Sequence, residues 1–468
     1  MREPKPLFIN EDNLGLVTDF YQLTMAAGYL QNDMNYPATF ELFIRRLPEN
    51  RSFLIAAGLE QALHYLTHLR FSREAVEYIR CHPAFKHVHK DFFSYLKKFR
   101  FSGEVFAIPE GTPVFAEEPL LRVTAPIIET QLIETYLLAT INFQTLIASK
   151  AVRVVLAARG REVVDFGSRR AHGPQAAVLA ARACFIGGCR STSNVLAGQQ
   201  LGIPVLGTMA HSWVMAFDTE EESFRAFHRA FPENTALLID TYDTLRAAQL
   251  ARELNIGDKL LAVRLDSGDL LSLSKGVRKI LDEGGLGHVK IMASGDLNED
   301  RIDELMRNNA PIDIFGVGTE MVTSRDQPAL GGIYKLVEQE RYGRHVPRMK
   351  FSEDKVFYPS SKQVYRFLNP GGVYERDVIG VEKEDIGGQP LLELIMHKGK
   401  LCKELPDLKD IQDRTLESLS HLPEGLKRLR TESAPSLRSR AGLGGYPVRK
   451  SQRLEELKRQ TEEGLRRG

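Results

Sequence analysis

Several short segments of this sequence place charged residues directly after an apolar run that resembles a β-strand. In one of them, Arg264 and Asp266 are separated by a single residue, so on a strand both side chains lie on one face and Leu265 on the other. An arginine can hold a phosphate, and a neighbouring carboxylate can accept hydrogen bonds from sugar hydroxyls. The alternative is a salt bridge at a strand end followed by an aspartate helix cap. We favour the functional interpretation.

Two other segments place glycines before stretches that look helical: Ser294-Gly295-Asp296 and Gly316-Val317-Gly318-Thr319. Exposed backbone N–H groups at such turns can form an anion-binding nest, which a following helix N-terminus strengthens. Motifs of this kind are weak evidence alone, because glycine and aspartate also make ordinary turns and caps. Two of them after neighbouring strands point to a phosphate site.

Two further segments offer an aromatic ring and a histidine. Phe166 stands close to Arg169 and Arg170, which suits a planar aromatic carboxylate: the ring stacks and an arginine takes the carboxylate with two hydrogen bonds. His211 follows another apolar run, where either a packed residue or a catalyst is expected. A core phenylalanine with two surface arginines is the alternative for the first segment.

The elements that must position these residues follow a regular order between about residues 136 and 340. Each short apolar run is followed by a polar, glycine-rich cluster and then a helix-like stretch. The runs are Glu162–Phe166, Pro204–Gly207, Ala236–Ile239, Leu260–Leu265, Val289–Ala293 and Asp313–Val317. Alternating strands and helices predict a parallel sheet, and this many units favour a closed barrel over an open sheet. In such a barrel, the active site is built at the carboxyl ends of the strands.

The regions on either side differ from this pattern. Residues 1–135 mix helix-like stretches with short proline-punctuated runs, which predicts an α+β domain. Residues 136–340 form the predicted α/β barrel. Residues 341–468 return to β-like segments with a charged, helical tail, and we expect them to pack on the N-terminal domain.

The overall composition excludes several classes of protein. The 62 basic and 61 acidic residues nearly cancel, so nothing predicts binding to nucleic acid or to an anionic membrane. Four scattered cysteines without a CxxC pair predict neither a disulfide framework nor a zinc site, and fit a reducing cytoplasm. No apolar run is long enough for a membrane span, and the N-terminus does not resemble a signal peptide.

Taken together, these segments resemble the nicotinate phosphoribosyltransferase family. The matching segments occur in family order and span most of the chain. They are Thr18–Met25, Asp165–Arg170, Ser191–Gly198, Gly207–Ser212, Val263–Asp269 and Gly316–Thr319. The joint pattern is specific, whereas no single segment is.

The resemblance implies a type II phosphoribosyltransferase fold, with an α+β domain joined to an irregular α/β barrel, and a homodimer. In this family the pyridine ring lies between a tyrosine of the other subunit and a phenylalanine, which match Tyr21 and Phe166. The substrate carboxylate is expected at Arg169 with Arg170 beside it, and Ser193 is placed with them. The histidine that ATP phosphorylates matches His211. Ribose and phosphate contacts are expected from Arg264, Asp266, Ser267, Gly295, Asp296, Gly316, Gly318 and Thr319.

The resemblance also implies the reaction: nicotinate and phosphoribosyl diphosphate give nicotinate mononucleotide and pyrophosphate, with ATP hydrolysed and Mg²⁺ required. The sequence assigns no ligands to that Mg²⁺. Nicotinamide phosphoribosyltransferases share the barrel and the histidine, but an acidic residue near the amide is expected there, whereas Ser191–Asn194 is uncharged. A quinolinate phosphoribosyltransferase is expected to be shorter and more cationic, and a non-catalytic barrel would not retain arginine, aspartate and histidine at strand ends.

Overall fold

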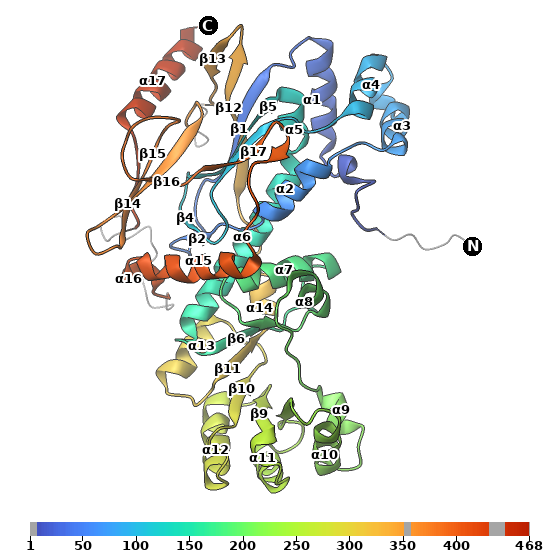
Figure 1. Ribbon diagram of the computed structural model, residues 1–468, viewed down its shortest axis with the longest axis vertical. Coiled ribbons are helices and arrows are strands. Elements are labelled where there is room, and N and C mark those ends of the chain that lie inside the picture. Colours follow the sequence, from blue (N-terminus) through green and yellow to red (C-terminus); the bar gives the residue numbers. More distant parts are fainter. Residues whose placement is uncertain (1–6, 351–356, 430–444, 468) are drawn as a thin grey trace. The chain divides into compact units, whose positions relative to one another are not determined.

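The chain divides into two compact units (Figure 1) in the computed structural model, which describes residues 7–350, 357–429 and 445–467. Unit 2 is Leu146–Pro328 with residues 427–429, and unit 1 is the remainder. The changes in composition near residues 135 and 340 fall in α6 (Glu134–Ala157) and β12 (Gly332–Arg341). The boundaries between the two units instead lie between residues 145 and 146 and between residues 328 and 329.

Unit 1 is built on a seven-stranded antiparallel sheet with the order β13-β12-β1-β5-β3-β17-β18. β1 (Pro37–Ile44) is rich in aromatic and aliphatic residues and is buried along all but its first residue. It pairs with β12, which lies far along the sequence, and with β5 (Pro119–Pro126). The remaining strands are β3 (Glu104–Ala107), β13 (Arg344–Pro347), β17 (Glu393–His397) and β18 (Lys400–Leu401). Segments before and after unit 2 thus share one sheet.

A smaller sheet with the order β16-β14-β15-β19 completes the β-structure of unit 1, together with the pair β2-β4. Its strands are β14 (Lys362–Leu368), β15 (Tyr374–Val381), β16 (Gln389–Pro390) and β19 (Val448–Lys450), and the pair is β2 (Leu54–Ile55) with β4 (Pro113–Val114). The helices are α1 (Phe20–Gln31), α2 (Leu59–His68), α3 (Arg73–Cys81), α4 (Lys90–Lys98), α5 (Ile127–Leu132), α15 (Leu408–His421), α16 (Glu424–Lys427) and α17 (Gln452–Arg467). The charged tail is therefore helical in α15 and α17.

Unit 2 contains a six-stranded sheet with the order β7-β6-β11-β10-β9-β8, in which every pair is parallel. The strands are β6 (Glu162–Asp165), β7 (Ser191–Thr192), β8 (Thr235–Leu238), β9 (Leu260–Leu265), β10 (Lys290–Ala293) and β11 (Ile314–Val317). Helices connect successive strands, since parallel neighbours need a crossover. They are α7 (Pro174–Ile186), α8 (Val195–Leu201), α9 (His211–Met215), α10 (Glu220–Ala230), α11 (Thr244–Glu253), α12 (Leu270–Glu283), α13 (Glu299–Arg307) and α14 (Thr319–Val322). The prediction of a parallel α/β fold is confirmed.

One predicted strand is wrong, and the barrel is not closed by hydrogen bonds among the described residues. Pro204–Gly207 is not a strand: only Val205 forms an isolated parallel bridge, to Thr192 of β7. Pro204 has no N–H to donate, which limits the ladder that this segment can make. β7 and β8 are the two edges of the sheet.

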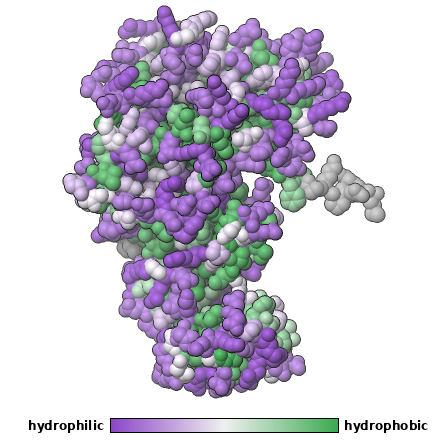
Figure 2. Space-filling view, in the orientation of Figure 1, coloured by the Kyte–Doolittle hydropathy of each residue, from purple (hydrophilic) through white to green (hydrophobic). Residues whose placement is uncertain are grey.

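The described residues include no helix long and apolar enough to cross a membrane. Hydrophilic residues cover much of the face drawn in Figure 2, with apolar side chains in smaller areas between them. This pattern is the usual one for a protein surface in contact with water.

A buried cluster of charges anchors α13 within unit 2. Glu299 accepts hydrogen bonds from Lys150 (2.5 Å) and Arg153 (2.9 Å), and Lys150 also lies 2.9 Å from Asp326. Burial raises the pKa of Glu299, but the charges and hydrogen bonds of Lys150 and Arg153 outweigh it, so the pKa lies below its usual range. Glu299 is therefore ionised and tied to two cations.

Replacing Glu299 with glutamine should lower the free energy of unfolding by about 3–5 kcal/mol, because it leaves buried cations without their counter-charge. Urea denaturation monitored by circular dichroism measures this. The control is Glu304→Gln on the same helix, which removes an exposed pairing with Arg301 and should change stability by less than about 0.5 kcal/mol. Equal stability of the two variants would contradict the structural role of the cluster.

Candidate active site

The carboxyl ends of β6, β9, β10 and β11 carry most of the residues that the sequence singles out. Parallel strands end at the same edge of a sheet, so the loops that follow them come together. All the predicted site residues except Tyr21 lie in unit 2. The structure of unit 2 therefore shows how these residues are arranged relative to one another.

The Arg264 side chain connects the loops after β9 and β10 with the segment before α9. Its Nε donates to Ser294 Oγ (3.1 Å), one Nη donates to Thr208 Oγ1 (2.8 Å), and the other donates to Asp266 Oδ1 (3.3 Å). Leu265 points away and is fully buried, as the strand alternation predicts. The guanidinium is thus fixed in place before any substrate binds.

Asp266 lies beside Arg264 as an ionised acceptor. Ser294 Oγ donates to its Oδ1 at 2.5 Å. Burial raises the pKa of this carboxyl, but the Ser294 hydrogen bond and the charge of Arg264 outweigh it, so the pKa lies below the ordinary value. The second oxygen, Oδ2, is 3.9 Å from His211 Nε2. A carboxylate in this state can accept hydrogen bonds from sugar hydroxyls.

Close backbone approach explains two of the glycines. Gly295 has a φ of +85°, and a Cβ there would stand 1.9 Å from the Asp266 carbonyl oxygen. A Cβ at Gly316 would stand 2.4 Å from the Phe166 ring. Asp296 also has a positive φ, of 42°, which continues the turn after β10. These positions hold the loops after β9, β10 and β6 against one another.

The helices that follow these two loops add little to anion binding. α14 is a single turn that starts at Thr319 after Gly318, and α13 starts with Glu299 and Asp300 behind the Asn298 cap. Acidic side chains in the first turn already compensate the partial positive charge of a helix N-terminus, so less of that charge is left for a bound anion. Backbone N–H groups of the loops and the Arg264 side chain are the groups that remain for a phosphate.

The turn after β6 is organised by Asp165. Its carboxylate accepts from Gly167 N (2.8 Å) and Thr192 Oγ1 (2.7 Å), and its carbonyl accepts from Ser193 N (2.8 Å). Burial raises the pKa of Asp165, and the two hydrogen bonds that its carboxylate accepts, from Thr192 and Gly167, oppose the rise. The hydrogen bond from Ser193 N to the Asp165 carbonyl places Ser193 next to the turn that carries Phe166.

Phe166, Arg169 and Arg170 differ in their surroundings. The Phe166 ring is half-buried, packs against Val164, Met292 and Ile314, and lies 5.8 Å from the Arg264 guanidinium carbon. Arg169 and Arg170 are exposed and form no ion pair with any residue that the structure describes. Both guanidinium groups are therefore available to an anionic ligand.

His211 begins α9 and is surrounded by acceptors. Its Nδ1 is 3.3 Å from Thr241 Oγ1, and its Nε2 is 3.9 Å from Asp240 Oδ1 as well as from Asp266 Oδ2. The side chain is 39% exposed, which leaves it open to a reactant. A partly exposed imidazole beside two carboxylates can act as a nucleophile or as a base.

Asp240 is a site residue that the sequence analysis did not single out. Its Oδ2 accepts from Asp266 N (2.9 Å) and Ser267 Oγ (2.6 Å), but its buried Oδ1 has no hydrogen-bond partner. Nearby, burial raises the pKa of Glu220 to about 7; Arg246 opposes the rise, while Asp243 and Asp240 add to it. This corner carries surplus negative charge.

Thr208, Thr241 and Ser294 were also missed as individual residues. Each stands shortly after one of the apolar runs, and this position is the feature of the sequence that could have marked it as a candidate site residue. What identifies them is the hydrogen bonding to Arg264 and His211, which no sequence pattern encodes.

Tyr21 is on α1 in unit 1, where its ring is about half exposed. Burial, followed by the charges of Glu134 and Asp19, raises its pKa, so the hydroxyl is neutral. Tyr21 and Phe166 belong to different units, and their stacking on the two faces of a pyridine ring stays a prediction.

Family models of three nicotinate phosphoribosyltransferase domains match the chain: the N-terminal domain over residues 16–142, the family domain over 161–337 and the C-terminal domain over 385–433. The chain is 46% identical to nicotinate phosphoribosyltransferase pncB2 of Mycobacterium tuberculosis, covering 94% of this chain and 92% of that protein. It is 39% identical to the nicotinate phosphoribosyltransferase of Bacillus subtilis, covering 97% and 98%.

The fold agrees with these matches. The crystal structure of human nicotinic acid phosphoribosyltransferase superimposes with a TM-score of 0.82 at 30% identity, over 95% of this chain and 99% of that chain. By sequence along most of its length and by fold, the chain belongs to the nicotinate phosphoribosyltransferase family.

Proposed function

We propose that this protein transfers a phosphoribosyl group from phosphoribosyl diphosphate to nicotinate, with ATP hydrolysis coupled through His211. The observation that carries the proposal is the fixed cluster of Arg264, Asp266 and His211 at one edge of the unit 2 sheet. Family membership supplies the reaction, which is the first step from nicotinate toward NAD, and we place it in the cytoplasm.

Recognition of the phosphoribosyl group is assigned to the loops after β9, β10 and β11. Asp266, with Ser267 beside it, accepts hydrogen bonds from the ribose hydroxyls, and Arg264 supplies positive charge. The backbone N–H groups at Gly295, Asp296, Gly316, Gly318 and Thr319 are assigned to the phosphate oxygens. Because four hydrogen bonds hold Arg264 beforehand, little reorganisation is needed when charge develops on the leaving diphosphate.

Recognition of nicotinate is assigned to the turn after β6. Arg169, with Arg170 beside it, takes the carboxylate, Phe166 stacks on the ring, and Ser193 lies at the edge of this turn. Tyr21 of the partner subunit covers the other face of the ring in a homodimer. The stretch Ser191–Asn194 is uncharged, so it provides no acidic acceptor for an amide and does not repel a carboxylate. This favours nicotinate over nicotinamide.

His211 is assigned the role of accepting a phosphoryl group from ATP. Phosphorylation adds about two negative charges, which would stand beside Asp266 and Asp240. Repulsion between like charges within this cluster changes how a diphosphate is held next to it. That is a local route by which ATP hydrolysis can drive product formation.

Residues are present that fit the Mg²⁺ expected in this family, although no group of three His, Cys, Asp or Glu side chains forms a metal cage within the described residues. Mg²⁺ is usually held by one or two carboxylates together with substrate phosphates. Asp240, with its unpartnered Oδ1, and Asp266 are the carboxylates that would contribute. The ion would neutralise charge on the departing diphosphate. We further propose that the open sheet corresponds to the irregular barrel of the type II fold.

The purified protein should convert nicotinate, and not nicotinamide, to its mononucleotide. In Arg169→Lys the positive charge stays but the planar fork is lost, so kcat/KM for nicotinate should fall about tenfold or more. Arg229→Lys, on the exposed side of α10, is the matched control and should keep its activity. Unchanged kinetics in Arg169→Lys would assign the carboxylate to Arg170 or another group, and a preference for nicotinamide would overturn the proposed function.

His211→Asn should fold normally, lose ATP hydrolysis and keep a weak transfer activity that is independent of ATP. The reason is that asparagine preserves polarity but offers no nucleophilic nitrogen. Wild-type protein incubated with γ-labelled ATP should carry an acid-labile, base-stable label that peptide mapping places on His211. Label at another residue, or ATP hydrolysis in the variant, would refute the assignment.

Shared active sites predict complementation between two inactive variants. Tyr21→Ala and Asp266→Ala homodimers should each be inactive, whereas mixing them should restore activity in hybrid dimers that contain one intact site. Subunit exchange is followed by native mass spectrometry with one variant isotopically labelled. Full exchange without recovered activity would show that each site is formed within one subunit.

A further inference from the structure

Thr208 is hydrogen-bonded to the guanidinium of Arg264 and stands three residues before His211. Its Oγ1 accepts from an Nη atom at 2.8 Å, which is the shortest of the four hydrogen bonds that this guanidinium donates. The proposed function assigns Arg264 to the departing diphosphate and His211 to the phosphoryl group of ATP. Thr208 is therefore in contact with one of these groups and close along the chain to the other.

The hydrogen bonds around Thr208 join three groups. The Nη of Arg264 that donates to Thr208 also donates to the Met209 carbonyl at 3.2 Å. The Thr208 hydroxyl in turn donates to that same carbonyl at 3.3 Å. The threonine is thus acceptor and donor at once, which a hydroxyl group can be and a methyl group cannot.

The segment that leads from Thr208 to His211 has few attachments of its own. Before it, the backbone N–H of Leu206 donates to a carbonyl of β7 at 3.0 Å. Residues 207–210 form no helix or strand, and α9 begins without a side-chain cap. The two hydrogen bonds from Arg264 are therefore what fixes this segment between β7 and α9 within the described part of the chain.

The short helix α9 is held differently at its two ends. Trp213 Nε1 donates to the Ser223 carbonyl (3.1 Å), and the Trp213 ring lies 5.9 Å from the Phe227 ring, so the middle of the helix is attached to α10. His211, at the first position, has a 3.3 Å contact with Thr241 and stands 3.9 Å from two carboxylates. Contacts of this length hold a side chain weakly. The position of the imidazole therefore depends on the segment that precedes it.

We propose that Thr208 is a positioning residue, which places His211 through residues 208–210 and joins it to Arg264. The inference rests on the proposed function for the two groups that it joins. In that function an imidazole nitrogen bonds to the γ-phosphorus of ATP as the bond to ADP breaks, and water later takes the phosphoryl group as orthophosphate.

The link explains how the two sites affect one another. A guanidinium group binds phosphate oxygens strongly, so a diphosphate that draws Arg264 toward itself competes with the Thr208 hydroxyl. Any change in that hydrogen bond reaches His211 through three residues of backbone, and the effect is reciprocal, as coupling between two binding sites must be. Without the hydroxyl, Arg264 keeps its hydrogen bonds to Ser294 and Asp266, but its attachment to the His211 segment is reduced. ATP is then hydrolysed with less mononucleotide formed.

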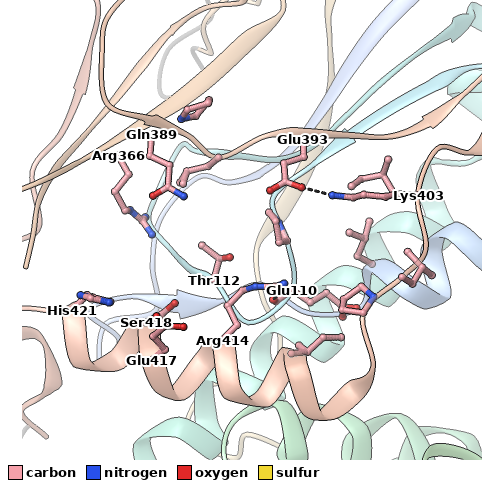
Figure 3. A pocket seen from close by; sticks show the side chains of 18 of the residues that line it. Glu110, Thr112, Arg366, Gln389, Glu393, Lys403, Arg414, Glu417, Ser418 and His421 are labelled. Atoms are coloured by element: carbon pink, nitrogen blue, oxygen red, sulfur yellow. Dashed lines mark hydrogen bonds and ion pairs between the residues drawn. The ribbon is translucent and has the colours of Figure 1, made fainter. Parts of the chain in front are cut away.

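Labelling of His211 by diethyl pyrocarbonate tests the positioning role without ATP or substrate. Thr208→Val removes the hydroxyl and keeps the branched shape, and Thr208→Ser keeps the hydroxyl. The matched control is Thr112→Val in unit 1, the same substitution at a threonine that lines the cavity in Figure 3. Peptide mapping, with the exposed His288 as internal reference, should show His211 labelled about threefold faster in Thr208→Val. Thr208→Ser and Thr112→Val should match the wild type.

The number of ATP molecules hydrolysed for each mononucleotide formed tests the link between the sites. This ratio should rise about threefold or more in Thr208→Val and return to the wild-type value in Thr208→Ser. A merely structural role would lower both rates in proportion and leave the ratio unchanged. An unchanged ratio, or unchanged labelling of His211 in Thr208→Val, would overturn the inference about Thr208 alone. A wild-type protein that hydrolyses no ATP would refute the proposed role of His211 and the link together, whereas the labelling rates would still decide whether Thr208 positions His211.

Discussion

The Arg264 guanidinium is the group on which the rest of the site depends. It joins its own strand to Ser294 after β10 and to Thr208 before α9. A planar guanidinium has five donors in fixed directions and can hold several segments in a defined geometry, whereas an ammonium group has three donors that rotate freely. The positions of Asp266 and the Gly295 turn follow from this arrangement, since Ser294 donates to Asp266 and a side chain at Gly295 would strike the Asp266 backbone.

A second constraint is the concentration of carboxylates around His211. The Asp240 side chain is almost fully buried, yet one of its oxygens lacks a hydrogen-bond partner. Burial raises the pKa of the nearby Glu220, and the charges of Asp243 and Asp240 add to that rise. Such an arrangement is unfavourable by itself, because buried charges are stable only when paired. A cation bound at this place would supply the missing counter-charge.

Periodicity was sufficient to predict five of the six expected strands of unit 2 and the pairing of Arg264 with Asp266. It failed at Pro204–Gly207, because a short apolar run does not reveal that proline removes a donor from the ladder. It also missed β7, whose residues Ser191 and Thr192 are polar and carry no strand signal. Asp240 and Thr208 could not be predicted as site residues, since their roles depend on contacts between distant segments. The placement of Tyr21 opposite Phe166 rests on the family resemblance alone.

The pairing of β1 with β12 has a consequence for synthesis of the chain on the ribosome. Ala38 pairs with Gln339 and Ile44 with Gly332, so the β1–β12 pairing cannot form until nearly three quarters of the chain has emerged. The neighbouring strands β5 and β3 lie within the first 126 residues. Unit 2 lies between β1 and β12 as an almost continuous stretch of sequence and has its own sheet. Because domains generally fold as units during synthesis, unit 2 can fold first. Until β12 is synthesised, one edge of β1 stays unpaired, and unpaired strand edges are prone to aggregation. The nascent chain therefore leaves one edge of β1 unpaired throughout the synthesis of unit 2, while the other edge can already pair with β5.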